Sequence, residues 1–316
     1  MQLKRDVVTL TLNPALDVAT SVAKVEPVHK LRCGAPRFDP GGGGINVARV
    51  VHRLGGSALC VYPAGGSTGE RLTSLLEAEG APAAPVAIAG ETRESFNVTD
   101  RADGSEYRFV LPGPQLSARE LERCLEDAVA AAHRGGFLVA SGSLPPGAPP
   151  GTLGDLAKRA RAGGLRLVVD TSGPALAAAL TGGVHLVKPN LRELSDHLGR
   201  PLPDAASRLQ ACRDLIASGA AEIVALSLGA EGALLVSAQE AWTVAAVAIR
   251  PASTVGAGDS FLAGLVWALS QDMGLADALR HGAAAGAATL LSPGTELCRR
   301  DEVLALAARI SPARLS

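Results

Sequence analysis

The sequence has no excess of charge of either sign and few aromatic residues. Its 316 residues include 30 Lys and Arg against 31 Asp and Glu, a formal net charge of -1, and aromatic residues make up only 3%. Because a nucleic-acid binder needs a basic face, this balance argues against nucleic acid as a partner. Hydrophobic residues make up 47% of the chain, enough for a sizeable core, so global disorder is excluded as well.

Closely spaced cysteines and long apolar runs are also missing. The cysteines are odd in number and no two have CxxC spacing, so we expect reduced thiols, no zinc knuckle and no disulfide framework. No run reaches the roughly 20 apolar residues of a membrane span, and no signal-peptide segment follows the first residues. We therefore expect a cytoplasmic protein without a membrane partner. The cysteines are Cys33, Cys60, Cys124, Cys212 and Cys298.

Strand-like and helix-like segments alternate along most of the chain. This alternation predicts βαβ units, and hence an α/β fold with a mostly parallel sheet and helices on both faces. No linker or internal repeat interrupts the pattern, so we expect one domain over residues 1–316, with a late antiparallel pair at 234–236 and 241–249. The other expected strands are 7–12, 58–62, 137–140, 165–170, 184–187 and 222–226. The expected helices are one ending at Leu54, then 68–79, 117–133, 151–162, 174–180, 204–218, 259–270 and 275–291.

Two segments do not fit this alternation and predict a small separate sheet. Residues 18–38 are less apolar and contain two prolines, which is typical of edge strands. Residues 91–111 alternate polar and apolar side chains on both sides of Asp103-Gly104, the pattern of a β-hairpin with one wet face. We expect these two segments to form a lid beside the main sheet.

A loop of small residues at 253–258 precedes Asp259 and an apolar helix. The first N–H groups of a helix lack partners within the helix and carry a partial positive charge, so an anion can bind there. Gly256 and Gly258 have no side chains that would block a phosphoryl group, and Asp259 could take a proton from an attacking hydroxyl. The alternative is that Asp259 is only a helix cap and the glycines only form a tight turn.

Four consecutive glycines, Gly41 to Gly44, stand just before Asn46 and another expected helix. The pattern is neither the G-x-G-x-x-G of dinucleotide-binding folds nor a P-loop, whose Gly-Lys-Ser/Thr occurs nowhere in the chain. The glycines would let the backbone approach a polar ligand, and Asn46 could bind hydroxyl groups. The alternative is a flexible loop that leads into a helix.

Three further loops follow expected parallel strands, and ligands of open α/β sheets bind at that edge. In the first, Lys188 and Asn190 could bind phosphate oxygens, while Glu193 could hold Mg²⁺ or only stabilise a helix N-terminus. The loops 141–147 and 227–232 consist largely of small residues and are ordinary turns when taken alone. Together, loops at one sheet edge would form a pocket.

The sequence resembles the pfkB-type, ribokinase-like carbohydrate kinases over essentially its whole length. Residues 41–49 and 254–261 are similar to the two signature loops of that family, and the Lys-Pro-Asn-x-x-Glu run at 188–193 is another of its motifs. Residues 9–17 point to the branch that acts on phosphorylated hexoses. The segments 30–33, 63–66 and 107–110 narrow the resemblance to bacterial kinases of fructose 6-phosphate.

The resemblance implies a role for each matching residue. Asp259 would be the catalytic base, with Gly256, Ala257 and Gly258 as the anion hole. The residues for the sugar would be Asp17, Gly42, Gly43, Asn46 and Ser143. Those for ATP would be Lys188, Asn190, Ser227, Leu228, Gly229, Gly232, Thr254, Ala283 and Ala287. Glu193 would organise Mg²⁺, and a monovalent cation such as K⁺ would bind near Ser253, Val255, Thr289, Ser292, Gly294 and Glu296. The resemblance also implies a homodimer whose two lids pack together.

Cationic residues in the expected lid favour a phosphorylated substrate on separate grounds. The chain has only five lysines, and Lys30 falls in the lid segments together with Arg32, Arg93 and Arg108. Several cations on a mobile flap suit the capture of a sugar phosphate, whereas a nucleoside kinase would need an apolar lid. The alternative is that these charges only keep an edge sheet soluble.

These observations predict in-line transfer of the ATP γ-phosphoryl group to a hydroxyl of fructose 6-phosphate, with Asp259 as general base. Fructose 1-phosphate and tagatose 6-phosphate remain alternative substrates. A sensor that binds a sugar phosphate without turnover is a rival of another class, and the intact Asp259 argues against it. A dinucleotide-binding oxidoreductase is a third rival, and the spacing of the glycines argues against that.

Overall fold

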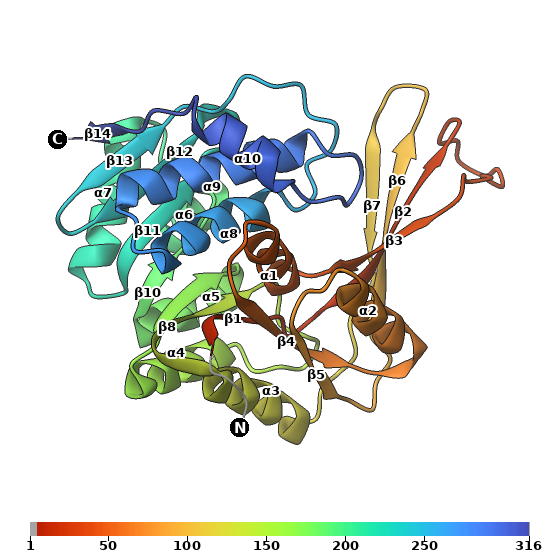
Figure 1. Cartoon of the computed structure of the whole chain (residues 1–316), viewed down its shortest axis with the longest axis horizontal. Helices are drawn as coiled ribbons and strands as arrows, with labels where there is room; N and C mark the ends of the chain where they lie inside the picture. Colours follow the sequence, from red (N-terminus) through yellow and green to blue (C-terminus); the bar gives the residue numbers. More distant parts are fainter. Residues whose placement is uncertain (1–4, 316) are drawn as a thin grey trace.

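A ten-stranded sheet is the middle layer of the structure, a computed structural model that describes residues 5–315 (Figure 1). In spatial order its strands are β14 (Ala313–Leu315), β13 (Ala241–Val244), β12 (Ala233–Ser237), β11 (Ala221–Ser227), β10 (Val184–Val187), β9 (Arg166–Asp170), β8 (Ala132–Ser141), β1 (Arg5–Leu10), β4 (Ala58–Ala64) and β5 (Ala83–Ala87). From β11 to β5 the strands are parallel, whereas β12, β13 and β14 extend the sheet in antiparallel fashion. The mostly parallel sheet predicted from the sequence is confirmed.

Helices cover both faces of this sheet, as expected. Successive residues of a strand point to opposite faces, so the buried Val7 and Val8 of β1 belong to two separate cores. The first core is covered by α1 (Gly43–Arg53), α2 (Gly66–Ala78), α8 (Ala257–Ser270), α9 (Leu275–Leu290) and α10 (Arg300–Ala307). The second is covered by α3 (Ala118–Ala131), α4 (Thr152–Gly163), α5 (Gly173–Gly182), α6 (Leu191–Leu198) and α7 (Ala205–Ala217). Among residues 5–315, no helix combines the length and the hydropathy needed to cross a bilayer.

A separate four-stranded sheet stands beside the main body (Figure 1). Its strands, in spatial order, are β3 (Arg37–Gly41), β2 (Ala15–Val22), β6 (Arg93–Asp100) and β7 (Glu106–Val110), and we call it the small sheet. The two segments predicted to form it do so, but its strands reach from Ala15 to Gly41 and leave 23–36 as an exposed loop. The predicted hairpin is β6 and β7, which are antiparallel.

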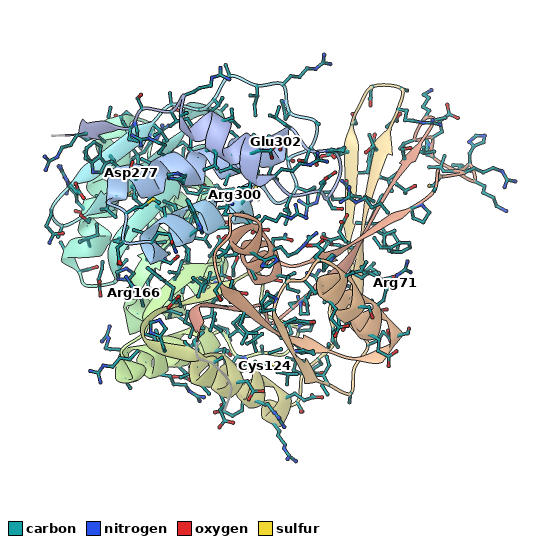
Figure 2. All side chains as sticks on the ribbon, in the orientation of Figure 1. Arg71, Cys124, Arg166, Asp277, Arg300 and Glu302 are labelled. Carbon is teal, nitrogen blue, oxygen red and sulfur yellow. The ribbon has the colours of Figure 1, made fainter. Side chains whose placement is uncertain are left out.

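Contacts with α2 and with the 292–297 segment fix the small sheet to the main body. The guanidinium of Arg71 in α2 lies 3.4 Å from the ring centre of Phe38 in β3, and Figure 2 shows Arg71 on the side of the molecule that carries the small sheet. Arg37 and Asp39 of β3 reach the other segment: Arg37 donates to Glu296 at 2.9 Å, and the Thr295 hydroxyl donates to Asp39 at 2.5 Å. Strand β3 is therefore one of the places where the small sheet is joined to the main body.

Four helices or strands were not among those predicted, α6 being one of them, and one predicted strand is too long. The strand expected over 241–249 stops at Val244, because its partner β12 begins at Ala233, which pairs with Val244 and leaves nothing to pair further residues. The missed strand β5 contains alanines and a proline, residues with poor strand propensity, and forms only because β4 pairs with it at the sheet edge. Helix α10 and strand β14 at the end of the chain were also missed. All five cysteines are free, as expected.

Candidate active site

Asp259 lies in the first turn of α8, at the carboxyl edge of the parallel strands. Its Oδ2 accepts a hydrogen bond of 2.8 Å from the side-chain amide of Asn46 in α1. The helix cap is Gly256, with φ +74, and no side chain caps the helix. The alternative in which Asp259 is only the cap is therefore wrong. The backbone N–H groups at the start of α8 have no side-chain acceptor and can receive an anion.

The glycine-rich loop is short and closely packed rather than flexible. Gly41 ends β3 and Gly43 begins α1, so Gly42 alone separates a strand from a helix. A Cβ at Gly43 would lie 2.3 Å from the Ser141 Oγ and 2.9 Å from the Ser141 carbonyl carbon at the end of β8. Only glycine allows this approach of α1 to the sheet edge. The alternative of a flexible loop leading into the helix is wrong, and the loop sets the position of Asn46.

Burial changes the acidity of Asp259. Desolvation is the largest cause and the neighbouring Asp170 carboxylate the second; together they raise the pKa of Asp259 to about 7. The hydrogen bond from Asn46 and the charge of Lys188 act in the opposite direction. A carboxyl group with such a pKa can accept a proton from a hydroxyl near neutral pH and release it afterwards.

Lys188 and Asp170 form a buried ion pair beside Asp259. The Lys188 Nζ lies 3.0 Å from Asp170 Oδ1, and Lys188 is 6% exposed. Burial alone would lower the pKa of Lys188, but the Asp170 and Asp259 carboxylates outweigh it and raise the pKa, so the ammonium stays charged. Lys188 was predicted from the sequence and Asp170 was not. Asp170 ends the predicted strand 165–170, and that position was the signal that could have identified it.

Asp17 of the small sheet has a perturbed acidity as well. Burial raises its pKa to about 6, while the charges of Arg108 and Arg93 lower it and the charge of Asp39 raises it. The register places Arg93 opposite Ala15, and Arg108 opposite Asn97, which pairs with Ala19. Three residues predicted from separate motifs, Asp17, Arg93 and Arg108, therefore lie in one part of the small sheet.

Arg93 has no carboxylate partner among the hydrogen bonds of residues 5–315. Its Nη2 and Nη1 donate to the main-chain oxygens of Asn13, at 3.0 Å, and Leu111, at 3.1 Å. Burial lowers the pKa of Arg93, which the charge of Asp17 partly counteracts. A partly buried guanidinium held only by carbonyl groups can still pair with an incoming anion.

Lys30 and Arg32 were predicted to help capture a sugar phosphate from the lid segments. Both are exposed in the 23–36 loop, which begins after Val22, whereas Asp17 is near the other end of β2. At about 3.3 Å per residue, the eight-residue strand separates its two ends by roughly 23 Å. The role predicted for Lys30 and Arg32 in capturing a sugar phosphate stays a prediction, and the structure places both beyond the end of β2 that lies away from Asp17.

The Lys-Pro-Asn-x-x-Glu motif at 188–193, which was predicted to contact the nucleotide, forms the N-terminal cap of α6. The Asn190 side chain accepts a bond from the Glu193 N–H at 2.9 Å, and the Glu193 carboxylate accepts one from the Asn190 N–H at 2.8 Å. The alternative that Glu193 stabilises a helix N-terminus is confirmed, and its metal role stays a prediction. Ser227 of the neighbouring strand donates its N–H to the Pro189 oxygen at 3.1 Å, so these two loops adjoin.

The remaining nucleotide candidates lie in two groups. Residues 229–231 form a short 3₁₀ turn, which the buried Arg208 of α7 holds by a 2.7 Å bond to Glu231. On α9, Ala287 is buried and Ala283 half-buried in the first core, while Thr254 is exposed before the start of α8. Leu228, Gly229 and Gly232 are the predicted residues at that 3₁₀ turn.

Side chains predicted to hold a monovalent cation are bonded within the protein. The Thr289 hydroxyl donates to Ser260 at 2.7 Å, and the Glu296 carboxylate pairs with Arg37 at 2.9 Å and Arg299 at 3.5 Å. The Ser253 hydroxyl lies 3.2 Å from a Glu106 oxygen of β7. A cation there would take main-chain oxygens rather than these groups. The other candidates, Val255, Ser292 and Gly294, lie in the same two segments.

Comparison with known proteins gives consistent results. The model of the pfkB family of carbohydrate kinases matches residues 7–302. The chain is 47% identical to ATP-dependent 6-phosphofructokinase isozyme 2 of Mycobacterium tuberculosis, over 95% of this chain and 88% of that protein. It is 45% identical to ATP-dependent 6-phosphofructokinase isozyme 2 of Escherichia coli, over 96% of this chain and 98% of that protein. Identity to a 1-phosphofructokinase of Rhodobacter capsulatus is 35%, over 96% of both.

Solved structures of the E. coli enzyme have the same fold. Phosphofructokinase-2 in complex with fructose-6-phosphate superposes with a TM-score of 0.92 at 42% identity, covering 97% of this chain and 99% of that one. The complex of that enzyme with potassium superposes with a TM-score of 0.93 at 43% identity, and its tetrameric inhibited form with a TM-score of 0.91 at 42% identity. Both cover the same shares of the two chains. The small sheet is thus part of a fold that this chain shares over nearly its whole length.

Proposed function

Because the chain belongs to the pfkB family of carbohydrate kinases, we propose that it transfers the γ-phosphoryl group of ATP to fructose 6-phosphate, giving fructose 1,6-bisphosphate and ADP. The observation that carries the proposal is the position of Asp259. It is a carboxylate with a pKa of about 7 in the first turn of α8, beside backbone N–H groups that no side chain caps. A base and an anion site therefore meet at one helix terminus.

This site contains a side chain or backbone N–H group for each step of the phosphoryl transfer. Asn46 holds Oδ2 of Asp259, which leaves Oδ1 to take the proton of the attacking hydroxyl. As the hydroxyl oxygen bonds to the γ-phosphorus, the bond from phosphorus to the leaving ADP oxygen breaks. The N–H groups of Ala257 and Gly258 and the ammonium of Lys188 stabilise negative charge on the transferred oxygens. No covalent intermediate with the protein is needed.

Mg²⁺ fits the site as a companion of ATP. Among residues 5–315, no three His, Cys, Asp or Glu side chains form a metal cluster. A kinase needs only one or two carboxylates, since phosphates and water supply the other oxygen ligands. Glu193 is the carboxylate we assign to it, and it lies close enough to Lys188 to influence the acidity of that ammonium. The ion would neutralise charge on the ATP phosphates. For K⁺ we assign the main-chain oxygens of the 253–255 and 289–296 segments.

One observation supports a phosphorylated sugar, and a second favours fructose 6-phosphate among the phosphorylated alternatives. Arg93 presents an anion-binding guanidinium at the end of the small sheet that lies near Asp17. The 6-phosphofructokinase relatives are also more similar to this chain than the 1-phosphofructokinases are. The exposed Phe109 and Val110 of β7 would be covered if two small sheets packed together, so we assign a homodimer through them.

The test is a substrate panel with the purified chain, ATP and Mg²⁺. ADP release is measured with fructose 6-phosphate, fructose 1-phosphate, tagatose 6-phosphate and fructose. We expect the highest kcat/KM with fructose 6-phosphate. A higher value with another sugar phosphate would replace the assigned substrate, and calorimetric binding of fructose 6-phosphate without ADP release would favour the sensor.

The acidity of Asp259 gives a pH dependence. The active form is the carboxylate, which protonates as the pH falls through about 7. We therefore expect kcat/KM to be constant in the alkaline range and to fall about tenfold per pH unit below the pKa. Initial rates between pH 5.5 and 9, at saturating ATP and low sugar phosphate, measure this. A profile that stays flat down to pH 5.5 would contradict the role of Asp259 as the titrating base.

Replacing Arg93 tests the phosphate site. In Arg93→Gln the charge is lost, and a charge-assisted hydrogen bond contributes about 1.5–3 kcal/mol. We expect the KM for fructose 6-phosphate to rise by about 10- to 100-fold, while the KM for ATP changes little. Arg119→Gln, on the exposed surface of α3, is the matched control and should leave both constants unchanged. A KM for the sugar phosphate within twofold of the original would rule out Arg93 as its ligand.

A further inference from the structure

Asn13 contacts two residues that belong to the proposed sugar-phosphate site. It is buried, at 8% exposure, in the loop between β1 and β2. Its side-chain Nδ2 donates to Ser143 Oγ at 3.1 Å, and its main-chain oxygen accepts from Arg93 Nη2 at 3.0 Å. Ser143 follows β8 and Arg93 begins β6, so one residue joins the main sheet to the small sheet at this point.

The orientation of the Asn13 amide follows from its second contact. Nδ2 also lies 3.4 Å from the main-chain oxygen of Leu144, which can only accept. The nitrogen is therefore the atom that faces Ser143, and Ser143 Oγ is the acceptor of that bond. A hydroxyl that accepts from one side has its own hydrogen left to donate elsewhere. Ser143 is exposed, so this hydrogen can reach a ligand.

The other end of the amide supports a role in the site rather than in folding alone. Asn13 Oδ1 is buried and has no hydrogen-bond partner among residues 5–315. A Cβ added to Gly113 would lie 2.0 Å from it, so the chain after β7 passes directly over the amide. Leaving a buried polar atom unpaired is unfavourable, and a residue chosen only for stability would not carry that cost.

We propose that Asn13 is a positioning residue for phosphate recognition: its amide makes the Ser143 hydroxyl a donor, next to the Arg93 guanidinium that its main-chain oxygen holds. The inference rests on the proposed function, because the anion it serves is the phosphate of fructose 6-phosphate. Any substitution keeps the main-chain oxygen and hence the Arg93 contact. Neutral changes to the Asn13 side chain therefore act through its two partners, Ser143 and the main-chain oxygen of Leu144.

The decisive experiment is a double-mutant cycle with Asn13→Ala and Ser143→Ala, measured as KM for fructose 6-phosphate. We expect each single variant to raise this KM about 3- to 30-fold, and the double variant to be no worse than Ser143→Ala alone. If the KM of the double variant rose by the product of the two single increases, the two side chains would act independently and the inference would be overturned. If the unmodified chain did not turn over fructose 6-phosphate, the proposed function and the inference would both be wrong. If the unmodified chain is active but the two single increases in KM multiply in the double variant, only the inference is wrong.

Asn13→Asp separates positioning from a structural role. The carboxylate has nearly the same size but cannot donate, so it would accept the Ser143 hydrogen and place a negative charge beside Arg93. We expect the KM for fructose 6-phosphate to rise about 10- to 100-fold, with kcat and the KM for ATP within about twofold. A purely structural role would instead change all three constants together, and that result would contradict the proposal.

Discussion

Asp259→Asn should lower kcat by about 10²- to 10⁴-fold and leave the fold intact, because an amide cannot accept the proton of the attacking hydroxyl. The amide oxygen can still accept the hydrogen bond from Asn46 that now reaches Asp259 Oδ2. Steady-state kinetics with fructose 6-phosphate and ATP measure the loss. The control is Asp155→Asn, which changes an exposed first-turn aspartate on α4 and should leave kcat unchanged.

The same variant has a predicted effect on stability, and its sign follows from the pKa. The folded-state pKa of Asp259 is about 7, above the ordinary value of 3.8, so its ionised form destabilises the folded chain at high pH. Asp259→Asn should therefore be at least as stable as the original at pH 8. This advantage should shrink as the pH falls through 7 and be absent below 4. Near-normal turnover, or a lower Tm at pH 8, would contradict the assignment of Asp259.

Arg49→Met should destabilise the chain by about 3–5 kcal/mol, the usual result of removing one partner of a buried ion pair. Arg49 of α1 is 1% exposed. Its guanidinium binds both carboxylate oxygens of Glu79, donates to the Pro40 oxygen at 2.9 Å and lies 3.8 Å from Asp39. Methionine fills similar space but removes the buried guanidinium between two acids, which keep only the more exposed Arg37, 2.9 Å from Asp39, and Arg53, 3.7 Å from Glu79. Urea unfolding measures the free energy of unfolding.

The matched control for Arg49 is an exposed ion pair. Arg123 and Asp127 lie four residues apart on α3, 3.4 Å from each other, and both side chains are largely exposed. Arg123→Met should change the free energy of unfolding by less than about 0.5 kcal/mol. A loss below about 1 kcal/mol in Arg49→Met would mean that α1 and β3 are held by packing rather than by this guanidinium.

The sequence predicted the parts of the molecule that depend on local pattern. The alternation of strands and helices, the hairpin around Asp103-Gly104 and the glycine-rich starts of α1 and α8 all leave short-range signals. Strand β5 leaves none, because alanines and a proline become a strand only when β4 pairs with them. The same holds for helix α10 at the end of the chain.

The residues of the site also differ in whether a local sequence pattern could identify them. Asp259 and Asn46 were found because each follows a glycine-rich loop, although their contact joins residues 213 positions apart. Arg49 and Asn13 act through partners that are remote in the sequence, so no local spacing marks them, and Asp170 is marked only by its position at the end of a strand. The position of Lys30 and Arg32 could not be predicted for a related reason, since composition places charges in a segment but does not tell which end of an eight-residue strand they follow.

The single residue between β3 and α1 has a mechanical consequence. Strand β3 belongs to the small sheet, and helix α1 carries the amide that holds the Asp259 carboxylate. With only Gly42 between them, at φ +119, there is no slack to absorb a tilt of the small sheet. A sugar phosphate that pulls this sheet inward would thus turn the helix as well, and the base would be aligned by the arrival of its own substrate.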